Sequence, residues 1–287
     1  MQSTASRVLA HPEARYCLVD YSCPENTGSW FEKQFPRDVA VGRAIVERVV
    51  DHGMFNKCRA HNAGAQRALR AGAEYLCFLD ADTIVQPGFY EYLRKHVRRD
   101  KFLIAGQRED GSDVPSMTGL LVVHREAFER VGGFDEGFVG WGGEDIELRL
   151  RLFLLGGVGF DDVPLSLVRP IPHGNDLRTK FYAESSIAAS NNANMQRIHQ
   201  KLRTEWRGRM VRDLQDAERL WYRHSSGATN EYVDDYFDDR DDYFDDREEA
   251  EVPQRPAPVV RAPIPPTSSR RLAAAAARLR GYARESS

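Results

Sequence analysis

Apolar residues recur along the first part of the chain in short runs, and these runs alternate with stretches of helical spacing. The apolar runs predict strands at 16–20, 45–51, 75–79, 102–105 and 119–123. The intervening periodic stretches predict helices at 56–71, 88–98, 125–131 and 144–155, the last of which ends at a Gly-Gly pair. Strands that alternate with crossover helices predict an α/β fold with a mainly parallel sheet.

The remaining pattern predicts a helical extension and a disordered tail. Helical spacing continues over residues 177–224, and we expect Trp206 and Trp221 to pack on the domain. The heptapeptide DDYFDDR then occurs twice in tandem, before a Pro-rich and an Ala- and Arg-rich stretch. The expected boundaries are a domain at 1–205, a helical extension at 206–226, an acidic repeat tail at 227–252, a Pro-rich linker at 253–267 and a basic segment at 268–287.

Charge is segregated in the tail, although the 287 residues carry a net charge of only -3. Residues 231–251 hold 12 acidic side chains and two arginines, whereas 253–287 hold seven arginines and one glutamate. The first 230 residues are close to neutral, so we expect no nucleic acid as a partner. The basic end favours at most a weak contact with an anionic surface or partner.

The lengths of the apolar runs and the pattern of cysteines predict where in the cell the protein is located. No run reaches the roughly 18–20 apolar residues of a membrane span, and residues 1–17 lack a charged region followed by an apolar core. The four cysteines form no CxxC pair, which favours reduced thiols. We therefore expect a soluble, cytoplasmic protein.

The segment YLCFLDADTIVQPGF contains a pair of carboxylates at the end of an apolar run. Asp80 and Asp82 are two residues apart, so in extended backbone both side chains point to one side. Two hard oxygen donors suit Mg²⁺ or Mn²⁺, which also bind diphosphates. The spacing alone leaves a second interpretation open, because Asp often closes a strand as a turn residue.

The segment GGFDEGFVGWGGEDIELRLRL combines flexible backbone with carboxylates. Glycines bracket Trp141 and would let the indole approach a ligand. Glu144 and Asp145 follow at a predicted helix start, where the helix dipole favours their ionised forms. Such a carboxylate can act as a general base on a hydroxyl. Alternatively, the two acids only cap the helix and Trp141 only fills the core.

Two weaker signals involve basic side chains. Lys57, Arg59 and His61 lie at a predicted helix start, where backbone N–H groups favour an anion such as phosphate. His173 lies in the loop RPIPHGNDLR and could supply a nitrogen ligand to a metal. Basic residues at a helix start are usually only solvated, and a loop histidine is usually a surface residue.

Four segments together resemble a known family. In order and spacing, FNKCRAHNAGAQRAL, FLDADTIVQPGF, GLLVVHREAFERVGGFDEGFVGWGGEDIELRLRL and IPHGND resemble the metal-dependent GT-A glycosyltransferases. The likeness is strongest to the C-terminal galactosyltransferase module of β-1,4-galactosyltransferases and chondroitin-type polymerases, and it covers about residues 15–200. It implies a Rossmann-like GT-A fold with flanking helices, whose first strand is missing here.

The resemblance implies roles on the donor side of the site. Asp82 would bind Mn²⁺ or Mg²⁺ directly, with Asp80 beside it near the nucleotide ribose or a metal-bound water. His173 would be a further metal ligand. The remaining nucleotide-sugar contacts are implied for residues of the first matching segments, namely Asp20, Lys57, Arg59 and Asn62.

The resemblance also implies the acceptor side and a reaction. Trp141, Gly142 and Gly143 would face the acceptor sugar, with Asp145 as the base and Glu144 beside it. Retaining relatives tend to carry Asn after this Glu, so Asp145 favours inversion. The implied activity moves a sugar from a UDP-sugar to a hydroxyl of a glycan or similar acceptor. The alternatives are a retaining, polypeptide-type transferase and an inactive GT-A domain that acts as a binding scaffold.

Overall fold

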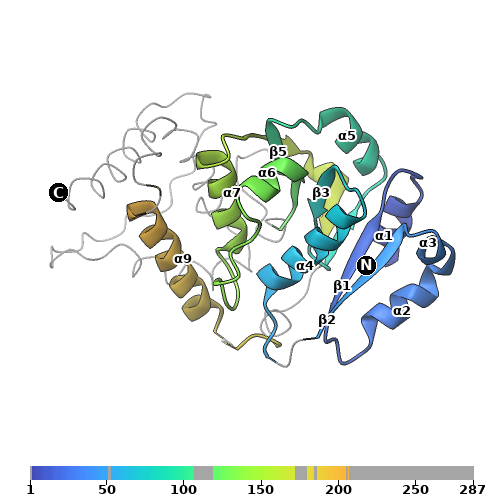
Figure 1. Cartoon of the computed structure of the whole chain (residues 1–287), viewed down its shortest axis with the longest axis horizontal. Coiled ribbons are helices and arrows are strands. Elements are labelled where there is room, and N and C mark those ends of the chain that lie inside the picture. The colour runs from blue at the N-terminus through green and yellow to red at the C-terminus, as the bar shows by residue number, and fades with distance from the viewer. Residues whose placement is uncertain are drawn as a thin grey trace, which may run out of the picture.

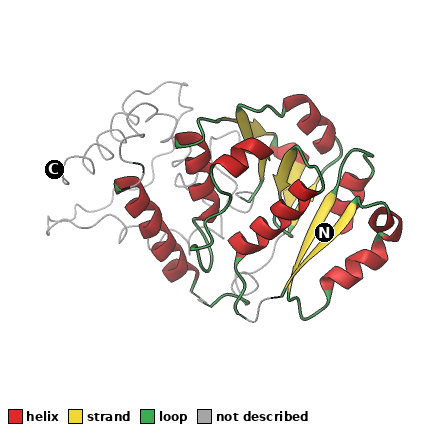
Figure 2. Ribbon diagram, in the orientation of Figure 1, coloured by secondary structure: helices red, strands yellow, loops and turns green. Residues whose placement is uncertain are grey.

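A computed structural model describes residues 2–50, 53–106, 119–171, 180–183, 186–204 and Trp206. Helices and strands alternate along most of this length, so the α/β class predicted from the sequence is confirmed (Figure 1, Figure 2). The predicted tail, its subdivisions, Trp221 and His173 lie outside the described residues.

The N-terminal part is a small two-stranded unit. It contains, in chain order, α1 (Gln2–Leu9), β1 (Tyr16–Tyr21), α2 (Thr27–Gln34), α3 (Pro36–Ala40) and β2 (Ala44–Val49). β1 and β2 pair in parallel, as crossover through helices requires. The residues described ahead of β1 form a helix and no strand. Buried Thr4 of this helix donates its hydroxyl to the carbonyl of Thr83 at 2.9 Å, so α1 is fastened to the rest of the domain.

A four-stranded sheet forms the centre of the molecule. Its strands, in chain order, are β3 (Tyr75–Phe78), β5 (Lys101–Ala105), β6 (Leu121–His124) and β7 (Gly159–Val163). Their spatial order is β3-β6-β5-β7, and β6 runs antiparallel to both neighbours while β5 and β7 are parallel. A separate antiparallel pair joins β4 (Thr83–Val85) to β8 (Val168–Pro170) after the 3-10 turn η2 (Leu165–Leu167).

The expectation of a mainly parallel sheet was wrong, because the described strands make three antiparallel pairings and two parallel ones. The physical reason lies between β5 and β6. A parallel neighbour needs a crossover connection, usually a helix, but the sequence between these strands has no helical periodicity. An antiparallel return is then the available pairing.

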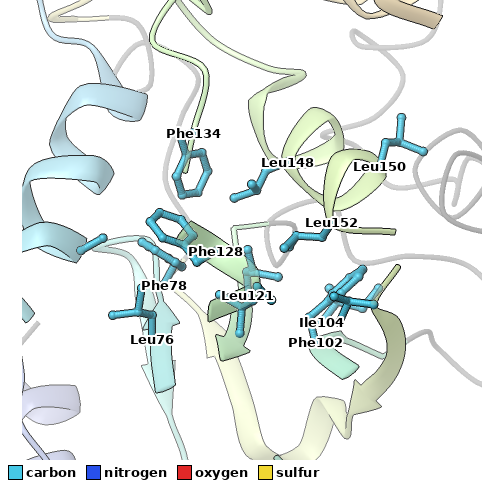
Figure 3. Close-up of a cluster of buried hydrophobic side chains, with 14 of the residues drawn as sticks. Leu76, Phe78, Phe102, Ile104, Leu121, Phe128, Phe134, Leu148, Leu150 and Leu152 are labelled. Carbon is cyan, nitrogen blue, oxygen red and sulfur yellow. The ribbon is translucent and has the colours of Figure 1, made fainter. Parts of the chain in front are cut away.

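The main core lies between this sheet and the helices that cover it. Among those helices are α4 (Lys57–Arg70), α6 (Arg125–Arg130) and α7 (Glu144–Leu154). The helix α5 (Phe89–His96) instead packs in a second cluster, with Leu103 and Val122. Phe78, Phe128 and Phe134 meet Leu148 and Leu152 of α7 in one buried cluster (Figure 3). All four helices match the predicted ones to within two residues at each end.

The predicted helix over 177–224 is only partly correct. Residues 180–183 form turns and a bend, and α9 (Ile187–Arg203) begins after Ser186, whose side chain accepts a hydrogen bond from the N–H of Ala189. Trp206 is 1% exposed and packs in the main core cluster, as predicted. α9 lies next to α7 in the view of Figure 1. Among the described residues, no helix is long and apolar enough to span a membrane.

Candidate functional site

Lys57 joins three carboxylates that are far apart in the sequence. Its Nζ lies 3.0 Å from Oδ1 of Asp80, 2.9 Å from Oε1 of Glu144 and 3.1 Å from Oδ2 of Asp145. We call these four residues the Lys57 cluster. Asp80, from the acidic pair after β3, and both acids at the start of α7 therefore reach Lys57, which belongs to the basic segment at the start of α4.

Local structure explains why these side chains meet. Asn56 caps α4 by accepting a hydrogen bond from the N–H of Arg59, and its Nδ2 also donates to the carbonyls of Glu136 and Phe138. The start of α4 is thus tied to the loop that precedes α7. Asp80 follows β3, and its carbonyl accepts from the N–H of Thr83 at 2.9 Å, which turns the chain there. The strand end and both helix starts consequently face one point.

The electrostatics of the Lys57 cluster are dominated by burial and by mutual attraction. The side chains of Lys57, Glu144 and Asp145 are 18%, 9% and 12% exposed. Burial alone lowers the pKa of Lys57, but attraction to Asp145, Asp80 and Glu144 outweighs it and raises that pKa well above its ordinary value. Burial raises the pKa of Glu144 despite the opposing effect of Lys57. One fixed cation thus holds three acidic groups.

One carboxylate oxygen of Glu144, the buried Oε2, lacks a hydrogen-bond partner within the described part of the chain. A buried carboxylate oxygen without a donor is costly, and a ligand hydroxyl would satisfy it. This atom belongs to the side that the sequence analysis assigned to the acceptor.

The Asp80 carboxylate is held against the backbone of Gly119. A Cβ atom at position 119 would come within 2.0 Å of Oδ2 of Asp80, far inside van der Waals contact. Gly119 precedes β6, the strand that pairs with β3. Any larger residue at 119 would therefore displace Asp80, a constraint that no sequence motif revealed.

The expected metal ligands are only partly described. Asp80 and Asp82 flank the turn after β3, and the carbonyl of Asp82 accepts from the N–H of Ile171 at 2.8 Å. Carboxylates are the hard donors that Mn²⁺ or Mg²⁺ prefers, so Asp80 of the Lys57 cluster and the nearby Asp82 fit such an ion. The described residues contain no group of three metal-ligating side chains.

The remaining donor-side residues have structural partners. Asp20 is the penultimate residue of β1 and accepts from the N–H groups of Cys23 and Gly28 at 2.9 and 2.8 Å, which orders the turn into α2. Arg59 lies 3.4 Å from both the Tyr21 hydroxyl and a Glu136 carboxylate oxygen. Arg59 thus links the first turn of α4 to the end of β1.

Asn62 of α4 contacts the loop that precedes α7. Its amide donates to the Phe134 carbonyl at 2.9 Å and its oxygen accepts from the Phe134 N–H at 2.9 Å. It also lines a cavity of about 450 Å³, whose described lining includes no member of the Lys57 cluster. The structure gives Asn62 a role in holding the 134–136 loop, and its predicted contact with the nucleotide sugar stays a prediction.

Residues 139–143 form a loop, here called the Trp141 loop, that leads directly into α7. The N–H of Trp141 donates to the hydroxyl of Ser190 in α9 at 2.6 Å. Gly142 and Gly143 have φ angles of 93° and 85°, which a residue with a side chain rarely adopts. The acceptor-side residues predicted from the sequence therefore share one loop that is held by α9.

Tyr182 is a neighbour of the Lys57 cluster that the sequence analysis missed. Its ring lies 5.4 Å from that of Phe55, and the Phe181 carbonyl accepts from the Phe55 N–H at 2.9 Å. Burial raises the pKa of Tyr182, and the charges of Lys57 and Glu144 also act on its phenol. The only signal for Tyr182 in the sequence is the adjacent aromatic pair Phe181 and Tyr182, which lies in an otherwise polar segment.

Comparisons with known proteins point to one family. Residues 112–169 match a protein family described as "N-terminal domain of galactosyltransferase". This matched segment contains β6, α6, the Trp141 loop and α7. It thus includes both acidic residues at the start of α7.

Curated relatives extend the likeness beyond this segment. Human β-1,4-galactosyltransferase 4 is 29% identical over 158 residues, which are 53% of this chain and 42% of the relative. Probable N-acetylgalactosaminyltransferase 9 of Caenorhabditis elegans is 29% identical over 123 residues, or 42% of this chain and 19% of the relative. A crystal structure of GalNAc-T7 with UDP, GalNAc and Mn²⁺ is 17% identical with a TM-score of 0.48, and the match covers 81% of this chain and 52% of that one.

The chain matches less than half the length of these curated relatives, so the likeness concerns one module of them. Within that limit, the family match includes the motif of the Trp141 loop and α7. The comparisons therefore support a galactosyltransferase-like module in this chain.

Proposed function

We propose that the chain is a metal-dependent glycosyltransferase that moves a sugar from a UDP-sugar to a hydroxyl of a glycan or similar acceptor, with inversion at the anomeric carbon. The observation that carries this proposal is the Lys57 cluster. A cation from α4 meets the acid after β3 and both acids at the start of α7. Binding of a diphosphate and activation of a hydroxyl need these two kinds of group within one site.

The donor side consists of Lys57, Asp80, Asp82 and Asp20. Lys57 would bind a diphosphate oxygen, since its pKa keeps it protonated at any working pH. Asp80 and Asp82 would hold Mn²⁺ or Mg²⁺, with His173, two residues after Ile171 in the sequence, as a further ligand. When bound, the ion neutralises the charge that develops on the departing diphosphate.

The acceptor side consists of Trp141 and the two acids of α7. Glu144 Oε2 would accept a hydrogen bond from an acceptor hydroxyl, because it lacks a partner among the described residues. Asp145 would remove the proton of the attacking hydroxyl. The acceptor oxygen then bonds to the anomeric carbon, the bond from that carbon to the diphosphate oxygen breaks, and its electron pair leaves with UDP.

The test is a donor screen on the full chain that measures UDP release from UDP-sugars with Mn²⁺, Mg²⁺ or a chelator, in the presence of candidate glycans. We expect release that requires both the metal and the acceptor, and a product of inverted anomeric configuration by NMR. A retained configuration would contradict inversion and favour the retaining alternative. UDP binding without any transfer would favour the scaffold alternative.

A further inference from the structure

The hydroxyl of Ser190 holds the centre of the Trp141 loop. Its Oγ accepts the hydrogen bond from the Trp141 N–H at 2.6 Å and lies 3.0 Å from the Trp141 carbonyl, to which it donates. One side chain thus satisfies both backbone groups of the residue that carries the indole. The position of Trp141 is therefore set from α9 and not from the loop alone.

Asn194, one helical turn further along α9, holds the two ends of the same loop. Its Nδ2 donates to the carbonyl of Val139 at 3.1 Å and to that of Gly142 at 2.7 Å. Residues four apart on a helix lie on one face, so Ser190 and Asn194 act on the loop together. They fix the backbone on both sides of Trp141.

Ser190 and Asn194 are both buried, so their hydrogen bonds to the Trp141 loop replace bonds to water. They are 4% and 5% exposed, so their polar groups depend on the loop for hydrogen bonds. α9 itself is anchored elsewhere, since Lys201 lies 2.6 Å from carboxylate oxygens of both Asp135 and Glu147. The helix is therefore a firm support, and the two polar residues are its contacts with the Trp141 loop.

The same packing accounts for the glycines of the motif. A Cβ at Gly142 would come within 2.4 Å of Oδ1 of Asn191, and one at Gly143 within 3.1 Å of Cβ of Asn194. These backbone atoms face α9. The two glycines thus allow the helix to approach the loop, a requirement separate from the contact with an acceptor that the sequence analysis assigned to them.

We propose that Ser190 and Asn194 are positioning residues for the acceptor, which hold the Trp141 loop in the conformation that places Trp141, Glu144 and Asp145 in one site. The loop runs without interruption into α7, so its backbone determines how the two acids are presented. Among the described residues, the side-chain hydrogen bonds of Ser190 and Asn194 all go to the Trp141 loop, and none goes to the donor side on β3 and α4. This inference rests on the proposed function and adds the acceptor-positioning element to it.

The test uses substitutions that change one contact at a time in the full chain. Ser190→Ala removes the hydroxyl, whereas Ser190→Thr keeps it. Asn194→Asp preserves size but replaces the donor by an acceptor that faces two carbonyl oxygens. Arg197→Ala is the matched control, because Arg197 also joins α9 to the domain but through Asp135, at 3.1 Å, outside the Trp141 loop.

The first readout is amide hydrogen exchange, which needs no activity. We expect faster exchange at residues 139–143 in Ser190→Ala and Asn194→Asp, with exchange at 148–154 unchanged, and parent-like exchange of the loop in Ser190→Thr and Arg197→Ala. Unchanged exchange of the loop in Ser190→Ala would overturn the inference. If Asn194→Asp does not fold, Ser190→Ala and Ser190→Thr still decide the question.

The second readout separates acceptor from donor. We expect kcat/KM for the acceptor to fall about tenfold to a hundredfold in Ser190→Ala, with UDP affinity in the presence of Mn²⁺ unchanged. A parallel loss of UDP affinity and acceptor use would overturn the inference in favour of a general structural role. Absence of transfer by the parent chain would contradict the proposed function, and hydrogen exchange alone would then decide the role of α9.

Discussion

Lys57 is the residue on which the candidate site depends. Three acidic side chains approach its ammonium group to within 3.1 Å, and one positive charge cannot neutralise three negative ones. The excess negative charge favours a divalent cation beside Asp80. An ion cluster that only stabilises the fold would not need more negative than positive charges. The composition of the cluster thus agrees better with a ligand site than with a contribution to stability alone.

Asp145→Asn tests the proposed base. The amide keeps the size of the carboxylate but cannot accept a proton, so turnover should fall by about 10²–10⁴ while UDP affinity stays near the parent value. Steady-state kinetics together with calorimetric UDP binding measure the two effects. Asp161→Asn is the control, because Asp161 is half-exposed and pairs with Lys101 on the surface. Near-parent turnover would move the base to Glu144.

Gly119→Ala tests the contact that positions Asp80. The added methyl group would overlap Oδ2 of Asp80, so the carboxylate must move and affinity for UDP with Mn²⁺ should fall by about tenfold or more. Calorimetric titration of UDP in the presence of Mn²⁺ measures this affinity. Gly159→Ala serves as the control, since its new Cβ would lie 3.6 Å from the nearest atom. Equal affinities of the two variants would argue against a role for Asp80 in donor binding.

At the scale of elements, periodicity in the sequence found α4 to α7 and the strands β1, β2, β3, β5 and β6, but it missed α1 to α3, β4 and β8. Short strands with exposed acidic residues escaped it: β7, with Asp161 and Asp162 exposed, lacks an apolar face. Sheet pairing escaped as well, because it depends on which strands meet in three dimensions. The candidate acids were identified from their motifs, whereas Ser190 and Asn194 were not, because polar residues on a helix usually face water.

Asp135 tests the anchoring of α9. Burial alone would raise the pKa of Asp135, but hydrogen bonds from Lys201, the Gly137 N–H and Arg197 outweigh it and lower that pKa to about 2. A lowered pKa stabilises the fold above the ordinary value near 4, and this stability is lost as the pH falls toward 2. Thermal unfolding should show this loss in the parent and much less of it in Asp135→Asn. An identical pH profile in both would contradict the assignment.

At the scale of the whole molecule, the described residues already form buried cores and the Lys57 cluster, and the last of them is Trp206. We therefore expect a chain shortened after Ser226 to fold and to bind UDP with parent affinity. Any loss should concern association with an anionic surface or partner, and it should weaken as salt screens the charges. Circular dichroism and UDP titration measure the outcome. Insolubility, or a loss of UDP binding, would show that residues beyond 226 complete the domain.

The most direct test of the central claim is calorimetric titration of UDP into the full chain, with Mn²⁺ and with a chelator, for the parent and for Asp82→Ala. The account predicts that the parent binds UDP in a metal-dependent manner, that Asp82→Ala abolishes the dependence, and that Asp80→Ala weakens it less. Equal UDP affinity with and without Mn²⁺, or an Asp82→Ala variant that binds like the parent, would contradict it.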